Sequence, residues 1–154
     1  MKPNSYTQIY IQLVIAVRFR EALLNKEIQP IVFKYISSVI TKMGHKSIIV
    51  NGVTDHVHIL IGLNSTINIA ETVQRIKRES SLFINQNKLC KFHFRWQEGY
   101  GAFSYSHSSI NKVYNYIKNQ DQQHKEKTFK TEYTSFLKAY EVEFEDQFLF
   151  YFGE

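Results

Sequence analysis

Two histidines separated by a single residue are the first candidates for chemistry in this chain. His56 and His58 lie in the run DHVHILI at positions 55–61. The branched neighbours predict a strand, on which side chains two residues apart emerge on the same face. Imidazole is a common ligand of divalent metals. The motif therefore predicts two metal ligands on the rim of a sheet, while two ordinary histidines on a solvent-facing strand are the simpler alternative.

A tyrosine and two amides form the second candidate group, on a helix expected to begin at Ser109. Tyr116 lies well off the apolar stripe of this helix, and Gln120 and Gln123 lie beside it one and two turns further on. A tyrosine hydroxyl next to an amide that can bind metal is a suitable nucleophile site, whereas a half-exposed surface tyrosine is the plainer interpretation. The stripe that we expect to face the core contains Ile110, Val113, Tyr114 and Ile117.

The order of the predicted elements indicates how these side chains are positioned. Strand patterns cover residues 6–17, 46–52, 55–62, 92–96 and 102–105. Helix patterns cover residues 30–44, 68–87, the segment after 109, and 126–140. The aromatic segment 142–152 is expected to pack on the body or on a partner.

Strand, helix, strand, strand, helix, strand is the split βαβ order of ferredoxin-like folds. We expect an α+β fold: an antiparallel sheet, helices on one face, and a C-terminal helical segment that carries the tyrosine. The other face is left for a ligand or a second subunit.

Length and composition limit the function classes. With 154 residues, six glycines and two prolines, the chain is expected to form one domain over residues 1–154. Its net charge of +5 and pI of about 9.2 are compatible with a polyanionic partner. Cys90 is the single cysteine, which excludes an internal disulfide and suits a reducing cytosol. No apolar run is long enough to span a membrane, and no secretory signal is visible, so we expect a cytoplasmic protein.

Basic residues on the second predicted helix are candidates for contacts with nucleic acid. Arg75, Lys77 and Arg78 could hold phosphates, while exposed aromatic side chains could stack on unpaired bases. A solvated helix face explains these charges equally well.

Four segments together give the chain a recognisable pattern: YTQIY at 6–10, DHVHIL at 55–60, WQEGYGAFS at 96–104 and YIKNQ at 116–120. In this order and spacing they resemble the single-tyrosine HUH transposases of the smallest bacterial insertion sequences and their repeat-associated relatives. The resemblance covers nearly the whole chain. One departure is visible, because QHK stands at 123–125 where relatives often have two histidines before a lysine. Gln123 is therefore a second candidate amide.

The resemblance implies a role for each matching residue. His56, His58 and Gln120 would bind a divalent metal, Mg²⁺ or Mn²⁺, and Tyr116 would attack single-stranded DNA to give a 5′-phosphotyrosine and a free 3′-OH. The DNA would carry hairpin-forming ends, and the enzyme would be a homodimer in which the tyrosine helix of one subunit completes the site of the other.

Because the ordinary pKa of tyrosine is about 10, the metal or a lysine, Lys112 or Lys118, would assist the attack. Asp55 either orients a histidine or simply begins the strand.

Other functions are compatible with parts of this pattern. A domesticated relative could bind or nick hairpin-forming repeats without being mobile, and a non-catalytic module could bind single-stranded nucleic acid with a decayed metal site. The intact set of His56, His58, Tyr116 and Gln120 argues against decay. Replication initiators and relaxases share the two-histidine motif, but they are usually longer than this chain.

Overall fold

The computed structural model describes residues 5–122 and 128–139. Its centre is a four-stranded sheet with the order β2-β3-β1-β4, in which every neighbouring pair is antiparallel. The strands are β1 (Tyr10–Ala16), β2 (Lys46–Gly52), β3 (His56–Gly62) and β4 (Gly101–Tyr105). The order and directions are those of a split βαβ fold, so the predicted α+β class is confirmed.

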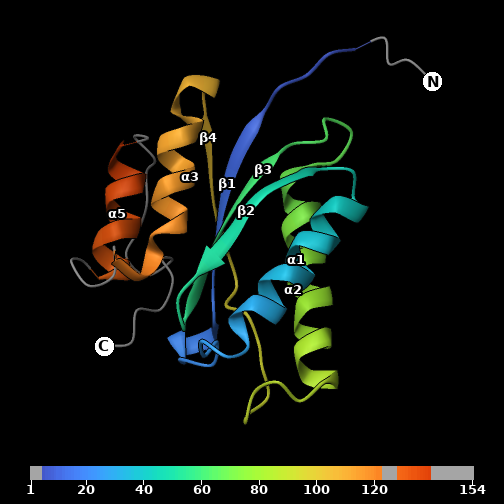
Figure 1. The fold of residues 1–154 in the computed structure, drawn as a ribbon, viewed down its shortest axis with the longest axis vertical. Helices are drawn as coiled ribbons and strands as arrows, with labels where there is room; N and C mark the ends of the chain where they lie inside the picture. Colours follow the sequence, from blue (N-terminus) through green and yellow to red (C-terminus); the bar gives the residue numbers. More distant parts are fainter. Residues whose placement is uncertain (1–4, 123–127, 140–154) are drawn as a thin grey trace.

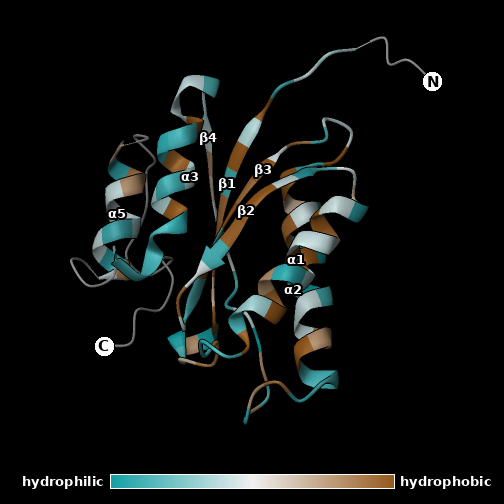
Figure 2. Ribbon diagram, viewed as in Figure 1, coloured by the Kyte–Doolittle hydropathy of each residue, from teal (hydrophilic) through white to brown (hydrophobic). Residues whose placement is uncertain are grey.

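One face of the sheet is covered by α1 (Gln29–Lys42) and α2 (Ile69–Gln86) (Figure 1). Pro30 lies in the first turn of α1, where its missing N–H costs nothing. Asn68 caps α2 by accepting a 2.7 Å hydrogen bond from the Glu71 N–H. The helices enclose a large aliphatic core with β1 and β3. Figure 2 shows brown along parts of β1 and β3 and mixed brown, white and teal bands on α1 and α2.

The second face of the sheet is covered by α3 (Ile110–Lys118) and α5 (Phe129–Ala139) (Figure 1). This differs from the prediction of an open second face, because the C-terminal helical segment folds back over the sheet as two helices. Tyr116, the tyrosine of the predicted site, lies on α3. Gly101 permits the close approach of α5, since a Cβ at this position would lie 2.8 Å from the Tyr133 ring.

Several predicted boundaries change. Residues 92–96 form no strand, and only Trp96 makes an isolated bridge, to Val17. The strand predicted from Tyr6 begins at Tyr10. Ser109 occupies the N-cap of α3 without a capping hydrogen bond from its side chain, because a 3₁₀ turn, η2 (His107–Ser109), leads directly into the helix. The segment 142–152 lies outside the described residues. No helix among the described residues is long and apolar enough to cross a membrane.

Candidate active site

The histidine pair lies on the central strand β3 and faces α3 and α5. His56 and His58 point away from the aliphatic core, which receives Val57, Ile59 and Ile61 from the same strand. Both imidazoles are fully buried, at 0% exposure. The predicted alternation is therefore correct, but the predicted position at the sheet rim is wrong. Because β3 is flanked by β1 and β2 and covered by α5, the histidines are withdrawn from solvent.

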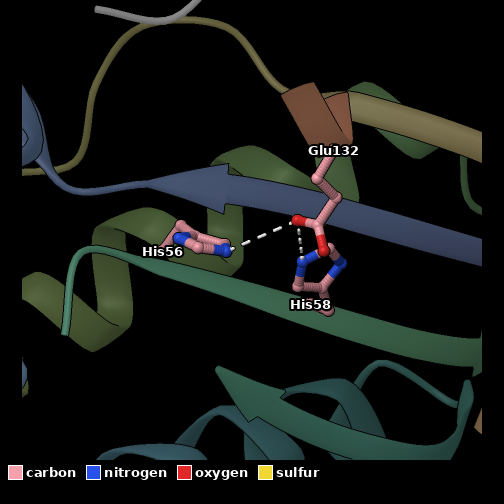
Figure 3. A group of neighbouring side chains, drawn as sticks. All are labelled: His56, His58 and Glu132. Carbon is pink, nitrogen blue, oxygen red and sulfur yellow. Dashed lines mark hydrogen bonds and ion pairs between the residues drawn. The ribbon is translucent and has the colours of Figure 1, made fainter. Parts of the chain in front are cut away.

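Glu132 of α5 supplies the third side chain of the site (Figure 3). Its Oε1 atom lies 3.1 Å from His58 Nε2 and 3.6 Å from His56 Nε2. The candidate ligand atoms of the three residues all lie within 4.8 Å of one another. Glu132 is itself only 1% exposed, so a carboxylate and two imidazoles are buried together on this face of the sheet.

Charged side chains hydrogen-bond in series to the Nδ1 atom of His56, the ring nitrogen that faces away from Glu132. Asp55 Oδ1 accepts a 2.7 Å hydrogen bond from His56 Nδ1, while Asp55 Oδ2 accepts two from the Arg20 guanidinium at 2.5 and 3.0 Å. Arg20 adopts a left-handed conformation with φ of 53°, which is uncommon for a residue with a side chain. The Phe129 ring stacks on His56 with the ring centres 3.9 Å apart. These contacts fix the ring and direct Nε2 towards Glu132 (Figure 3).

Neutral groups hold the outer side of His58. The Gln12 side-chain nitrogen donates to His58 Nδ1 at 2.8 Å, and the Gln12 oxygen accepts from the Tyr105 hydroxyl at 2.7 Å. Gln12 is fully buried on β1, the neighbour of β3. Both histidines thus have their Nδ1 atoms occupied and their Nε2 atoms directed at the same carboxylate.

The helix α3 brings Tyr116 to this group. Its hydroxyl donates a hydrogen bond to Glu132 Oε2, the second oxygen of the carboxylate. The Tyr116 ring meets His58 edge-on, with centres 6.0 Å apart. Tyr116 is half-buried beside Val113 and Ile117, so the prediction that it lies well off the packed stripe is wrong. Tyr114, predicted to be a core residue, is 37% exposed.

The correction for Tyr114 has a geometric reason. α3 packs on β2 and β3, and Asn51 of β2 donates to the carbonyl oxygens of Ile117 and Lys118 at 2.9 and 3.1 Å. This orientation turns Val113, Ile117 and the following turn inward. The predicted stripe is thus confirmed for Ile110, Val113 and Ile117 and is wrong only for Tyr114.

Gln120 follows α3 and is fully buried. Neither its side-chain nitrogen nor its oxygen has a hydrogen-bond partner among the described residues. A buried amide without partners costs roughly 1–3 kcal/mol. Lys112 and Lys118 are exposed on α3, and Gln123 lies outside the described residues.

The protonation equilibria of the site are coupled. Burial opposes ionisation of Glu132, but hydrogen bonds from His56 and His58 outweigh it and hold its pKa at about 2. Burial lowers the pKa of His56 less than its hydrogen bonds to Asp55 and Glu132 raise it, so its pKa rises. For His58 burial dominates, and its pKa falls. Without metal, the site therefore combines an ionised carboxylate with one imidazole that favours a proton and one that does not.

The three basic residues singled out on α2 have different surroundings. Arg75 pairs with Glu79 at 2.7 Å. Lys77 Nζ donates to the carbonyl oxygens of Gln97 and Gly99 at 2.7 and 2.6 Å, and burial lowers the pKa of Lys77 to about 8. Arg78 is exposed. A pocket of about 830 Å³ adjoins α2, and its lining includes Lys77 and Arg78 together with Arg18, Phe19, Arg95 and Trp96.

Sequence reasoning did not single out Glu132. The helix itself was predicted, and its buried side chains Phe129, Tyr133 and Leu137 have helical spacing. Glu132 falls within that apolar stripe. A carboxylate on the buried face of an amphipathic helix is rarely found without a partner, and this was the available signal.

The side chains present fit a divalent metal ion. Two imidazole nitrogens and one carboxylate oxygen converge, and each imidazole is oriented by a partner on its other nitrogen, as metal-binding histidines usually are. The predicted ligands His56 and His58 are thus brought together, and Glu132 is added to them.

Comparisons with known proteins identify the family and the fold. A family model described as "Transposase IS200 like" matches residues 5–120. A Deinococcus radiodurans R1 protein described as a transposase superposes with a TM-score of 0.61 at 18% identity, over 78% of this chain and 96% of that chain. A REP-associated tyrosine transposase bound to a REP hairpin gives 0.59 at 13% identity, over 80% of this chain and 73% of that chain. No curated protein sequence matched the chain.

These structural likenesses show the shared fold, and the family match extends from β1 to Gln120. The resemblance seen in the sequence motifs is therefore confirmed. Because the match covers well over half of the chain, this protein belongs to the IS200-like transposase family of DNA-processing enzymes.

Proposed function

We propose that this protein cleaves and rejoins single-stranded DNA through a covalent 5′-phosphotyrosine at Tyr116. The observation that carries the proposal is the convergence of the Tyr116 hydroxyl, the two histidine Nε2 atoms and the Glu132 carboxylate at one point. A nucleophile beside a group of side chains that can bind metal is one arrangement that supports phosphodiester transesterification.

In the proposed reaction, Tyr116 Oη forms a bond to phosphorus and the bond from phosphorus to the 3′ oxygen breaks. The proton lost by the tyrosine is balanced by the proton that the 3′-OH gains. A second 3′-OH then reverses these steps on another strand, and the tyrosine recovers its proton. A bound Mg²⁺ or Mn²⁺ would polarise the phosphate oxygens. His56, His58 and Gln120 would hold this ion, and Lys112 and Lys118 are available near the same helix for the phosphate charge.

The path of the DNA in this proposal follows the basic pocket beside α2. Arg18, Arg78 and Arg95 line it with Trp96 and with Phe19, which is 55% exposed. Guanidinium groups attract phosphates and aromatic rings stack on unpaired bases. Arg75 and Lys77 would contribute charge at its edge. The hairpin bound by the REP-associated relative supports a hairpin-ended substrate here.

Covalent trapping tests the reaction. The protein is incubated with Mg²⁺ or Mn²⁺ and single-stranded oligonucleotides from the DNA that flanks its gene, then denatured. We expect a slower-migrating adduct in the wild type that is absent from Tyr116→Phe and from samples with chelator. Tyr114→Phe is the matched control, because Tyr114 lies on the same helix but is exposed. No adduct on any flanking strand, with the protein folded, would favour a DNA-binding module instead.

The resemblance implies a homodimer in which the tyrosine helix of one subunit completes the site of the other. We keep the homodimer in the proposal but, unlike that arrangement, place Tyr116 in the site of its own chain. The 6.0 Å between the Tyr116 and His58 rings of one chain supports action in cis. Mixing His58→Ala with Tyr116→Phe tests it. If the tyrosine acts in cis, the mixture forms no adduct, whereas recovered adduct would mean that the subunits exchange their tyrosine helices. Light scattering measures the assembly independently.

A further inference from the structure

Glu132 is a buried carboxylate whose two oxygen atoms face different partners. Oε1 lies towards the Nε2 atoms of His56 and His58, and Oε2 accepts the Tyr116 hydrogen bond. A carboxylate that is 1% exposed is costly to bury unless it is fully compensated. Its position on the apolar stripe of α5 therefore indicates a specific task at this site.

We propose that Glu132 is a metal ligand and that it also positions the nucleophile. Oε1 binds the ion together with His56 and His58, while Oε2 holds the Tyr116 hydroxyl at the edge of the metal site. This inference rests on the proposed function and adds to it a ligand from a helix beyond the segment that matches the family model, which ends at residue 120.

The spacing of the three side chains supports the ligand role. Adjacent nitrogen and oxygen ligands bound at about 2.0–2.2 Å in an octahedral site, the geometry favoured by Mg²⁺ and Mn²⁺, lie about 3 Å from each other. The observed separations between Glu132 Oε1 and the two Nε2 atoms are 3.1 and 3.6 Å. An ion can therefore enter between them with small adjustments of the side chains.

The outer contacts of the histidines support it as well. Asp55 occupies Nδ1 of His56 and Gln12 occupies Nδ1 of His58, so Nε2 is the atom available to a metal on each ring. Asp55 accepts from Nδ1, which leaves the lone pair of a neutral His56 on Nε2. The Gln12 amide has both a donor and an acceptor, so it can serve either tautomer of His58.

The ligand set predicts which ion binds best. Two imidazoles and a carboxylate, in addition to the Gln120 amide of the proposed function, suit transition metals such as Mn²⁺, whereas Mg²⁺ prefers oxygen ligands and retains its waters. One carboxylate cancels only part of the charge of a divalent ion, so the bound ion would still attract phosphate. We therefore expect tighter binding of Mn²⁺ than of Mg²⁺ by the metal-free protein.

Calorimetric titration of the metal-free protein with Mn²⁺ tests the ligand role without using activity. Glu132→Gln keeps the size of the side chain and removes its charge. We expect it to weaken Mn²⁺ binding by more than the roughly 10- to 100-fold that loss of an outer hydrogen-bond partner costs. Glu27→Gln is the matched control, because it removes an exposed carboxylate before α1, and it should bind as the wild type does. Glu132→Asp, which shortens the reach, provides a second variant if Glu132→Gln does not fold.

The outcomes separate this inference from the proposed function. Wild-type Mn²⁺ affinity in both Glu132 variants would overturn the ligand role, even if the wild type forms the DNA adduct. Tyr116→Phe should abolish the adduct and leave Mn²⁺ affinity within threefold of wild type. If the wild type binds Mn²⁺ through Glu132 but forms no adduct, the proposed DNA-cleavage reaction is contradicted and the role of Glu132 as a metal ligand is still supported.

The positioning role has its own readout. At Mn²⁺ and oligonucleotide concentrations that saturate Glu132→Gln, we expect its rate of adduct formation to stay at least tenfold below wild type, with KM for the oligonucleotide unchanged. A saturating rate equal to wild type would show that Glu132 binds metal without positioning Tyr116, and would overturn this half of the inference.

Discussion

The two faces of β3 are equally buried but are stabilised in different ways. Val57, Ile59 and Ile61 lie at 0% exposure in an aliphatic core under α1 and α2. His56 and His58 lie at 0% exposure on the opposite face, under α5. The aliphatic face needs only shape and volume, because its side chains carry no hydrogen-bonding groups.

The histidine face needs a partner for every polar atom. Its partners come from separate parts of the chain: Arg20 from η1 (Arg18–Arg20), Gln12 from β1, Tyr116 from α3 and Glu132 from α5. Burying charge in this way contributes little to stability and much to geometry. The comparison suggests that one face determines whether the chain folds and the other determines what it does.

Adjacent substitutions on the two faces give the largest contrast. We expect His58→Ala to lower the rate of adduct formation by at least about a thousandfold, because both metal binding and the site geometry are lost. Ile59→Ala should cost about 2–5 kcal/mol in the free energy of unfolding through the cavity it leaves. Gel assays of the adduct and urea denaturation measure the two effects. If Ile59→Ala, kept folded at low temperature, lost as much activity as His58→Ala, the two faces would not be separable.

A smaller effect is expected from the outer partner of His56. Asp55→Asn keeps the shape but weakens the hydrogen bond to His56 and the ion pair with Arg20. We expect Mn²⁺ affinity to fall by about 10- to 100-fold, as for other outer partners of metal-binding histidines. Calorimetry on the metal-free variant measures this change, with thermal unfolding in chelator as the control for folding. An unchanged affinity would mean that Phe129 stacking alone orients the ring.

The smallest effect concerns a charge on the aliphatic side, Lys77 of α2. Burial lowers its pKa to about 8 in the fold from an ordinary value of 10.5. Between these values the unfolded chain holds a proton that the folded chain has released, so stability rises with pH in this window. Relative to Lys77→Met, the wild type should gain about 1 kcal/mol from pH 7.5 to 10.5, a figure reduced for partial exposure. Urea denaturation at several pH values measures the difference, which should not stay constant.

The local patterns of the sequence were sufficient for much of the fold. β-branched alternation identified β2 and β3, the Asn68 cap identified the start of α2, and the period of two placed His56 and His58 together. Each of these features depends on neighbouring residues. The predicted strand at 92–96 failed because aromatic side chains favour strands, and here Phe94 is instead buried in the core.

The candidate site was only partly predictable because it is assembled over long distances. The motif at 116–120 indicated Tyr116 and Gln120, but the burial of Tyr116 depends on how α3 packs on β2 and β3. Glu132 approaches His58 from 74 residues further along the chain. Nothing in the local pattern around Glu132 specifies that pairing, so the covered histidine face emerges only in three dimensions.

That separation along the chain has a consequence for biosynthesis. The hydrogen bond between His58 and Glu132 spans 74 residues, which a ribosome adds in about 4–15 s at 5–20 residues per second. The aliphatic core between the sheet and its first two helices is encoded before α5 is translated. The nascent chain can therefore collapse around that core while its histidines are still uncovered. The group formed by His56, His58 and Glu132 is then completed only after that core, when α5 docks on the sheet.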